Sequence, residues 1–355
     1  MSFPNPSGPR LARSNTVERV SAFAAATGIG SWPGASAREA AEIVVGELHS
    51  LPHLVELPGR GVGADMIGRA GALLVDIGMD TVPRGYRIAA GRTAVMRRGR
   101  SLLDEDLDAL EEAWEKAGSR GTGRTIKVQA PGPITLATQL ELGNGHRALT
   151  DLGAVRDLTT SLGEGVAAHR AHVGRRLDAA VVVQYDEPLL SAALDGRLTG
   201  VTSLTPVHAV DEAMAIGLLD ECVAAVGAPT TIHGCASNVP WNVLQRSRID
   251  AISVDASLLG PTDLDRVGEF VDSGRTVVFG VVPSTAPEAR PSVEEVAKAA
   301  VSLTDRLGFA RSVLRERIGI SPACGLAGAT AEWARTAIGL AQKAADAFAE
   351  DPDAI

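Results

Sequence analysis

Three side chains in the sequence have the types and spacing needed to bind one metal ion: His233, Cys235 and Cys324. Residues i and i+2 of an extended chain point to the same side, so His233 and Cys235 can reach a common ion. Cys324 follows the last candidate strand and can close onto the same place. One imidazole with two thiolates suits zinc, and three protein ligands with an open fourth position are typical of a catalytic zinc site. Asp255, at the end of another strand, is the candidate for a fourth ligand that a substrate can displace.

A pair of acidic residues, Asp186 and Glu187, stands before a proline at the end of a further candidate strand. Such a pair can be a solvated strand exit, but at the mouth of a barrel we expect it to face the substrate. Cys222 lies within a helical pattern and is expected to pack in the core. His169 and His172 also lie in a helical pattern and are expected to be surface or core side chains.

Short apolar runs alternate with longer amphipathic segments along the chain, which is typical of a parallel α/β fold. Eight runs are candidate strands: Ala24–Gly30, Leu54–Leu57, Ile126–Ala130, Ala180–Gln184, Thr230–His233, Ala251–Val254, Thr276–Val281 and Arg317–Ile320. The candidate helices are Ala37–Leu48, Leu103–Lys116, Leu152–Arg176, Pro206–Val226, Asn238–Gln245 (short), Thr262–Ser273, Ser292–Leu307 and Ala329–Phe348.

Eight strands alternating with helices predict a (β/α)₈ barrel of the TIM type, as a single domain over residues 19–349. Such barrels carry their active-site residues at the C-terminal ends of the strands, which is where the polar clusters fall. A doubly wound open sheet is the alternative, although no candidate strand is followed by a Gly-x-Gly-x-x-Gly turn. The stretch between Leu57 and Ile126 is too long for one crossover, so we expect an insertion there. Residues 1–18 are expected to form a flexible arm and residues 350–355 a tail.

Composition excludes several other classes of protein. Of the 355 residues, 45 % are hydrophobic and 3 % aromatic, so the core must consist mainly of aliphatic side chains. A net charge of −9 argues against a nucleic-acid partner, because phosphate binding needs a basic surface. Three cysteines are no disulfide framework, which favours a reducing, cytoplasmic location. The sequence shows neither the pattern of a signal peptide nor an apolar run long enough for a membrane span.

Taken in order, these motifs resemble the catalytic C-terminal barrel of cobalamin-independent methionine synthase, over most of residues 24–345. The motifs that carry the resemblance are Ile29-Gly30-Ser31, Gly132-Pro133-Ile134-Thr135, Asp186-Glu187-Pro188, His233-Gly234-Cys235, Ile252-Ser253-Val254-Asp255 and Cys324-Gly325-Leu326. The resemblance implies zinc as the cofactor, held by His233, Cys235, Asp255 (where the family has glutamate) and Cys324. It also implies roles in binding an amino-acid substrate.

In the family, the turn that matches Ile29, Gly30 and Ser31 holds the carboxylate of the amino acid. The aspartate that matches Asp186 contacts its ammonium, and Glu187 belongs to the same substrate-binding motif. The expected substrate is therefore a homocysteine-like thiol, which zinc binding would deprotonate and keep as a nucleophile for methyl transfer.

The departures from the family pattern concern the methyl donor and the ammonium clamp. We expect no counterpart of the full-length enzyme's additional N-terminal barrel within these 355 residues. Arg60 and Val62 stand where the family has glutamates of the clamp. Gln139 stands in place of the tryptophan that stacks on folate, and Thr285 stands near the place of the histidine that protonates it.

The sequence therefore predicts a zinc-dependent thiol methyltransferase that converts homocysteine to methionine. A corrinoid donor, either methylcobalamin or a corrinoid protein, needs no protonation of its leaving group and is expected in preference to methyltetrahydrofolate. The alternatives are a methyltransferase for a different thiol, a non-catalytic zinc- or corrinoid-binding accessory protein, and a relative with decarboxylase-like chemistry. The zinc ligand set argues against the last of these.

Overall fold

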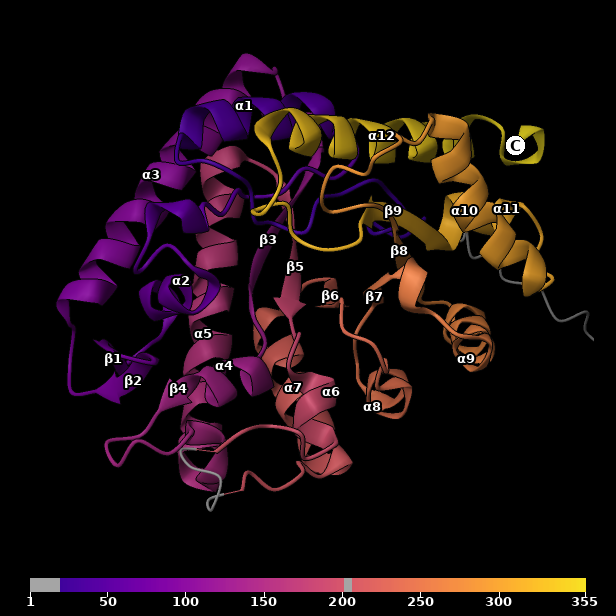
Figure 1. The fold of residues 1–355 in the computed structure, drawn as a ribbon. Coiled ribbons are helices and arrows are strands. Elements are labelled where there is room, and N and C mark those ends of the chain that lie inside the picture. The colour runs from indigo at the N-terminus through magenta and orange to yellow at the C-terminus, as the bar shows by residue number, and fades with distance from the viewer. Residues whose placement is uncertain (1–19, 201–205) are drawn as a thin grey trace, which may run out of the picture.

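The computed structural model describes residues 20–200 and 206–355, and its centre is a curled sheet of parallel strands (Figure 1). Six strands form this sheet in the order β3-β5-β6-β7-β8-β9, and every neighbouring pair is parallel. Their bounds are β3 (Thr125–Pro131), β5 (Ala180–Asp186), β6 (Thr230–Gly234), β7 (Ala251–Asp255), β8 (Thr276–Val282) and β9 (Ile318–Pro322). The predicted α/β barrel architecture is confirmed, and the open doubly wound sheet is not what forms.

The helices cover the outside of this sheet, and α1 and α12 lie side by side although they come from opposite ends of the chain (Figure 1). The long helices are α1 (Ala37–Glu47), α3 (Ala94–Lys116), α5 (Leu152–Leu177), α7 (Glu212–Val226), α9 (Pro261–Asp272), α10 (Val293–Arg306) and α12 (Ala331–Glu350). The shorter helices are η1 (Pro58–Arg60), α2 (Met66–Leu73), α4 (Pro133–Gln139), η2 (Ala148–Thr150), α6 (Leu190–Leu194), α8 (Trp241–Arg246), η3 (Ala256–Leu258), α11 (Ser312–Arg317) and η4 (Pro352–Ala354). No described helix is both long enough and apolar enough to cross a membrane.

The expected insertion lies between Leu57 and Ile126. It contains α2, an antiparallel hairpin of β1 (Gly78–Val82) and β2 (Gly85–Ala89), and the long helix α3. The hairpin pairs with the short strand β4 (Leu140–Glu141), which gives a second sheet of three strands. The insertion supplies buried charged residues to the barrel, as described below.

Two of the eight predicted strands, Ala24–Gly30 and Leu54–Leu57, are not regular strands. Each makes only isolated parallel bridges: Ala26 to Ile320 of β9, His53 to Lys127 of β3, and Ser31 to Glu56 between the two segments. These bridges nevertheless link the two edges of the six-stranded sheet. The segments therefore occupy the places of barrel strands one and two without forming a full ladder.

The physical reason is that side chains of β3 and β5 donate hydrogen bonds to backbone carbonyls of these segments. Lys127 donates to the carbonyl oxygen of Gly28, and Gln184 donates to that of Ile29. Gln129 donates in the same way to the carbonyl oxygen of Leu54. Because these side chains satisfy the buried carbonyls, the backbone does not need a continuous ladder there.

Two further boundaries differ from expectation. α7 begins at Glu212 rather than near Pro206, because the Asp211 side chain caps it by accepting from Ala213 N and Met214 N. α3 begins at Ala94, nine residues before the expected start at Leu103, with Thr93 as its N-cap. The predicted arm of residues 1–18 lies outside the described residues.

Gly165 allows α5 to approach the end of α2, and its substitution tests this packing. A Cβ atom at Gly165 would lie 2.0 Å from the carbonyl oxygen of Leu73, so one of the two backbones would have to move. We expect Gly165→Ala to lower the free energy of unfolding by about 1–3 kcal/mol, as overpacking does. Urea denaturation followed by circular dichroism measures the change.

Gly217→Ala is the matched control, because Gly217 lies within α7 and a Cβ there meets open space. Alanine in a helix interior should raise the free energy of unfolding by ~0.5–1 kcal/mol. Equal effects of the two substitutions would contradict the close contact between α5 and α2.

Candidate metal centre and substrate site

His233 lies near the C-terminal end of β6, and its imidazole has one nitrogen in a hydrogen bond and one without a partner. Its Nδ1 is 3.1 Å from the hydroxyl oxygen of Ser253, its neighbour in register on β7. Its Nε2 is buried and has no hydrogen-bond partner among the described residues. A buried polar nitrogen without a hydrogen-bond partner destabilises the folded state. Nε2 is therefore available as a metal ligand.

Cys235 follows β6 and Cys324 follows β9, and both thiols approach the imidazole of His233. The ligand atoms of the three residues all lie within 4.8 Å of one another. Donor atoms about 2.1–2.3 Å from a tetrahedral zinc ion lie roughly 3.5–3.8 Å apart, so small side-chain adjustments suffice to close the group on an ion. The structure therefore brings together three of the four predicted ligands, in a donor set that fits zinc.

The two thiols differ in how readily they lose a proton. The hydrogen bond from Cys235 and the neighbouring imidazole of His233 lower the pKa of Cys324 to about 4, although burial opposes the shift. The same hydrogen bond, together with burial, raises the pKa of Cys235. Cys324 is therefore the thiol that is first available as a thiolate ligand.

Close packing holds the loop that carries Cys324 in place. The amide of Ala323 donates to the carbonyl oxygen of Val282 at 2.8 Å, and the amide of Leu326 donates to that of Ser31 at 3.0 Å. A Cβ atom at Gly280 would lie 2.6 Å from the Cα of Ala323, which explains the glycine on β8. The predicted substrate turn at Ser31 is thus directly connected to the Cys324 loop.

The fourth predicted ligand, Asp255, does not join the group formed by the other three. Its Oδ1 accepts hydrogen bonds from the amide of Ser257 at 2.9 Å and from the Ser257 hydroxyl at 2.6 Å. Asp255 therefore acts as the N-cap of η3, an alternative for short acidic side chains that the strand pattern does not reveal.

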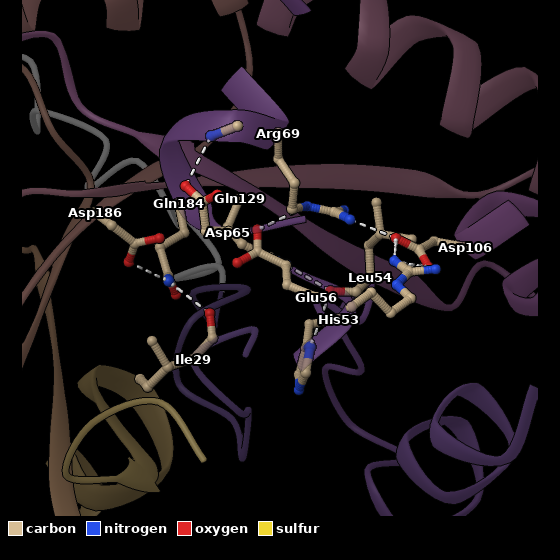
Figure 2. A network of polar contacts seen from close by, with 12 residues as sticks. Ile29, His53, Leu54, Glu56, Asp65, Arg69, Asp106, Gln129, Gln184 and Asp186 are labelled. Carbon is tan, nitrogen blue, oxygen red and sulfur yellow. Dashed lines mark hydrogen bonds and ion pairs between the residues drawn. The ribbon is translucent and has the colours of Figure 1, made fainter. Parts of the chain in front are cut away.

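Asp186 lies at the end of β5, in register with His233 of β6. Its side chain is buried and accepts a hydrogen bond from Gln184 Nε2 at 2.8 Å, as Figure 2 shows. Burial, aided by the nearby Glu56 carboxylate, raises the pKa of Asp186 to about 7, although His233, Lys127 and the hydrogen bond from Gln184 oppose the shift. The site thus holds a buried carboxyl group beside a candidate metal ligand.

Glu187, the other half of the acidic pair, points instead at the start of α4. Its two carboxylate oxygens accept hydrogen bonds from the amides of Ile134 and Thr135, both at 2.9 Å, and from the Thr135 hydroxyl at 2.7 Å. A Cβ atom at Gly132 would lie 2.2 Å from Glu187 Oε1, so the glycine leaves room for this carboxylate. The contacts seen for Glu187 are those of a helix cap.

Residues 23–347 match the family model described as "Cobalamin-independent synthase, Catalytic domain". The chain belongs to this family. The expected family resemblance is confirmed, and membership in the cobalamin-independent synthase family supports a methyltransferase activity. No curated protein sequence matches the chain.

Two structures illustrate the solved proteins that the chain resembles. One is a B12-independent methionine synthase from Shewanella sp. W3-18-1 in complex with selenomethionine, with a TM-score of 0.61 and 13 % identity, covering 94 % of this chain and all of that one. This likeness shows the barrel fold. The other is a GH113 β-mannanase from Alicyclobacillus acidocaldarius, with a TM-score of 0.42, 13 % identity, and coverage of 94 % and 97 %.

Arg60, which we expected at a position of the family's acidic clamp, takes part in an ion-pair network of the insertion. Arg60 pairs with Asp106 of α3 at 2.7 Å and is nearly buried, whereas Val62 is exposed. Arg69 of α2 lies between Asp106 and Glu56, 3.6 Å from the latter, as Figure 2 shows. This network thus places Glu56 inside the barrel, near Asp186.

Sequence reasoning missed these interior charges, and Lys127 with them. Lys127 is fully buried, and burial lowers its pKa while Asp186 and Glu56 raise it. The available signal was the alternation of polar residues along β3 and β5, at positions 127, 129, 184 and 186. Alternate residues of a strand share a face, so this pattern indicates a polar barrel interior.

The capping role of Glu187 can be tested by its removal. Glu187→Ala leaves two buried amides and one hydroxyl without an acceptor, so we expect a loss of about 3 kcal/mol or more in the free energy of unfolding. Thr135→Val, which removes only the hydroxyl, should cost ~1–2 kcal/mol. Urea denaturation of both variants gives the comparison, and a loss below 1 kcal/mol for Glu187→Ala would contradict the cap.

Proposed function

We propose that this protein is a zinc-dependent methyltransferase that transfers a methyl group to the thiol of homocysteine and so forms methionine. The observation that carries the proposal is the grouping of the three ligand atoms of His233, Cys235 and Cys324 within 4.8 Å, with His233 Nε2 buried and unpartnered. Buried cysteines without such a geometry are ordinary core residues, as Cys222 is here.

His233 would bind zinc through Nε2, because the hydrogen bond between its Nδ1 and Ser253 fixes the orientation of the ring. Cys235 and Cys324 would complete three protein ligands and leave a position for the substrate. Zinc bound there would keep the thiol of the substrate deprotonated and positioned as a nucleophile. Asp255, whose Oδ1 accepts from Ser257, would have to move toward the ion to join the ligands, which suits an exchangeable ligand.

The amino-acid head of homocysteine would bind between two elements that adjoin the candidate ligands. Asp186, beside His233 in register, would accept the ammonium group. The turn of Ile29, Gly30 and Ser31, tied to the Cys324 loop, would bind the carboxylate. The selenomethionine in the similarly folded Shewanella structure supports a substrate of this class.

We propose that the methyl donor is a corrinoid, as methylcobalamin or on a corrinoid protein, rather than methyltetrahydrofolate. Gln139 is an exposed residue at the end of α4, and Thr285 lines a cavity of about 450 Å³ beside Asp255 and Ala323. None of the described residues that line this cavity is aromatic or a histidine, so they offer no ring to stack on a pterin and no imidazole to protonate one. Methylcobalamin releases its methyl group as the carbon–cobalt bond breaks, with the electron pair staying on cobalt.

The metal assignment predicts the zinc content of cysteine variants. Purified protein should contain about one zinc per chain, and Cys235→Ser or Cys324→Ser should lose most of it because each removes a soft ligand. Cys222→Ser is the matched control, since Cys222 is buried in the core and should leave the zinc content unchanged. Atomic absorption measures the ratio, and full retention in both ligand variants would refute the site.

Asp255→Ala should weaken zinc binding less than Cys235→Ala does, because an exchangeable ligand contributes less than a permanent thiolate. Competition with a zinc chelator at graded concentrations ranks the two variants. The reverse order would mean that Asp255 is a permanent ligand and that the η3 cap opens when the metal binds.

The donor assignment predicts that methylcobalamin outperforms methyltetrahydrofolate. A missing general acid costs typically ~10²–10⁴-fold in rate, and methylfolate needs its leaving nitrogen protonated whereas methylcobalamin does not. Zinc-loaded protein should be assayed at saturating homocysteine with each donor in turn, scored as methionine formed. Faster turnover with methylfolate would refute the donor assignment. No methionine from either donor would favour a different thiol or a non-catalytic role.

A further inference from the structure

The most deeply buried charged side chain of the described barrel interior belongs to Lys127 of β3. It has no exposed surface, and its Nζ donates to the carbonyl oxygen of Gly28 and to Oε1 of Gln184. Burying a charge is costly unless it is paired and hydrogen-bonded. The Asp186 and Glu56 carboxylates compensate it electrostatically.

The contact with Lys127 determines how the Gln184 amide is oriented. An ammonium group only donates hydrogen bonds, so the amide oxygen must face Lys127 and the NH₂ group must face the other way. The Gln184 NH₂ group then donates to the carbonyl oxygen of Ile29 at 2.7 Å and to Asp186 Oδ1 at 2.8 Å (Figure 2). A flipped amide would present its oxygen to two other acceptors and lose all three hydrogen bonds.

We propose that Lys127 is a positioning residue, which fixes the Gln184 amide and through it holds Asp186 at a set distance from the Ile29–Ser31 turn. This inference rests on the proposed function, in which these two elements bind the ammonium and the carboxylate of the substrate. A link between them sets the spacing of the two charged ends that the site accepts. Lys127 and Gln184 therefore select thiols that carry an α-amino-acid head over thiols without one.

The first test uses Gln184→Met, which keeps the volume of the side chain but removes both donated hydrogen bonds. With methylcobalamin as the donor, KM for homocysteine should rise at least ~10-fold, the effect of losing one hydrogen bond to a charged group. The zinc content and the rate with 2-mercaptoethanol, which has no amino-acid head, should stay within about twofold. The kcat/KM for homocysteine divided by that for 2-mercaptoethanol should therefore fall; we call this quotient the thiol ratio.

Gln342→Met is the matched control. Gln342 is equally buried, accepts from Ser50 and donates to Asp346 at 2.8 Å, but it lies on α12 away from the barrel interior. Gln342→Met should lower the free energy of unfolding, as the loss of any buried amide does. It should leave the thiol ratio unchanged. A fall in that ratio for Gln342→Met as large as for Gln184→Met would overturn the proposal.

Lys127 itself is tested by its coupling to Gln184. Lys127→Met should lower the same ratio, and the double variant Lys127→Met with Gln184→Met should be no worse than Gln184→Met alone, because Lys127 acts through Gln184. If the losses of the two single variants add up in the double variant, Lys127 does not act through Gln184 and the proposal is overturned. Should Lys127→Met fail to fold, Gln184→Glu serves instead. It keeps an acceptor for Lys127 but loses both donors, so it should raise KM for homocysteine at least as much as Gln184→Met.

Direct titration of homocysteine by calorimetry separates this proposal from the proposed function. If zinc-loaded wild-type protein methylates neither thiol but binds homocysteine, a tenfold weaker affinity in Gln184→Met and not in Gln342→Met still supports the positioning role. Equal affinity in Gln184→Met and wild type would overturn it. Absence of homocysteine binding to the wild-type protein would overturn both proposals.

Discussion

The barrel depends on hydrogen bonds from three buried side chains, Lys127, Gln129 and Gln184, to backbone carbonyls of its first two segments. Neither segment forms a regular strand, and only isolated bridges connect them to β3 and β9. These side chains therefore do the work that a continuous ladder does elsewhere in the sheet. They also place the Ile29–Ser31 turn at the mouth, where the proposed substrate site requires it.

The closed curvature of the sheet is what brings the candidate metal ligands together. β6 carries His233 and β9 precedes Cys324, and these strands are three places apart in the sheet. In a flat sheet three interstrand spacings amount to about 14 Å. The ligand atoms lie within 4.8 Å of one another, so the curl of the sheet and the loop after β9 remove most of that separation. An open sheet with the same sequence motifs would not form this site.

The charged interior of the barrel is an ion-pair network that joins the insertion to the barrel strands. Arg60 is held by Asp106 of the insertion. Arg69 connects the same aspartate to Glu56, which lies close enough to Asp186 to affect its pKa. The buried carboxyl groups of the site are thus balanced by cations from α2 and β3. An incoming ammonium group would join a network that is already close to neutral.

The sequence by itself determined the six strands of the parallel sheet and the long helices, because apolar runs and helical periodicity depend on local burial. It also predicted His233, Cys235 and Cys324 as one group, since strand ends of a parallel barrel meet at one mouth. Only the tertiary structure decided what the polar side chains contact. Glu187 caps α4, Asp255 caps η3, and Gln184 connects Lys127 to Asp186. These partners lie on other elements or depend on which of several donors or acceptors is nearer. A pattern along one chain does not contain that information.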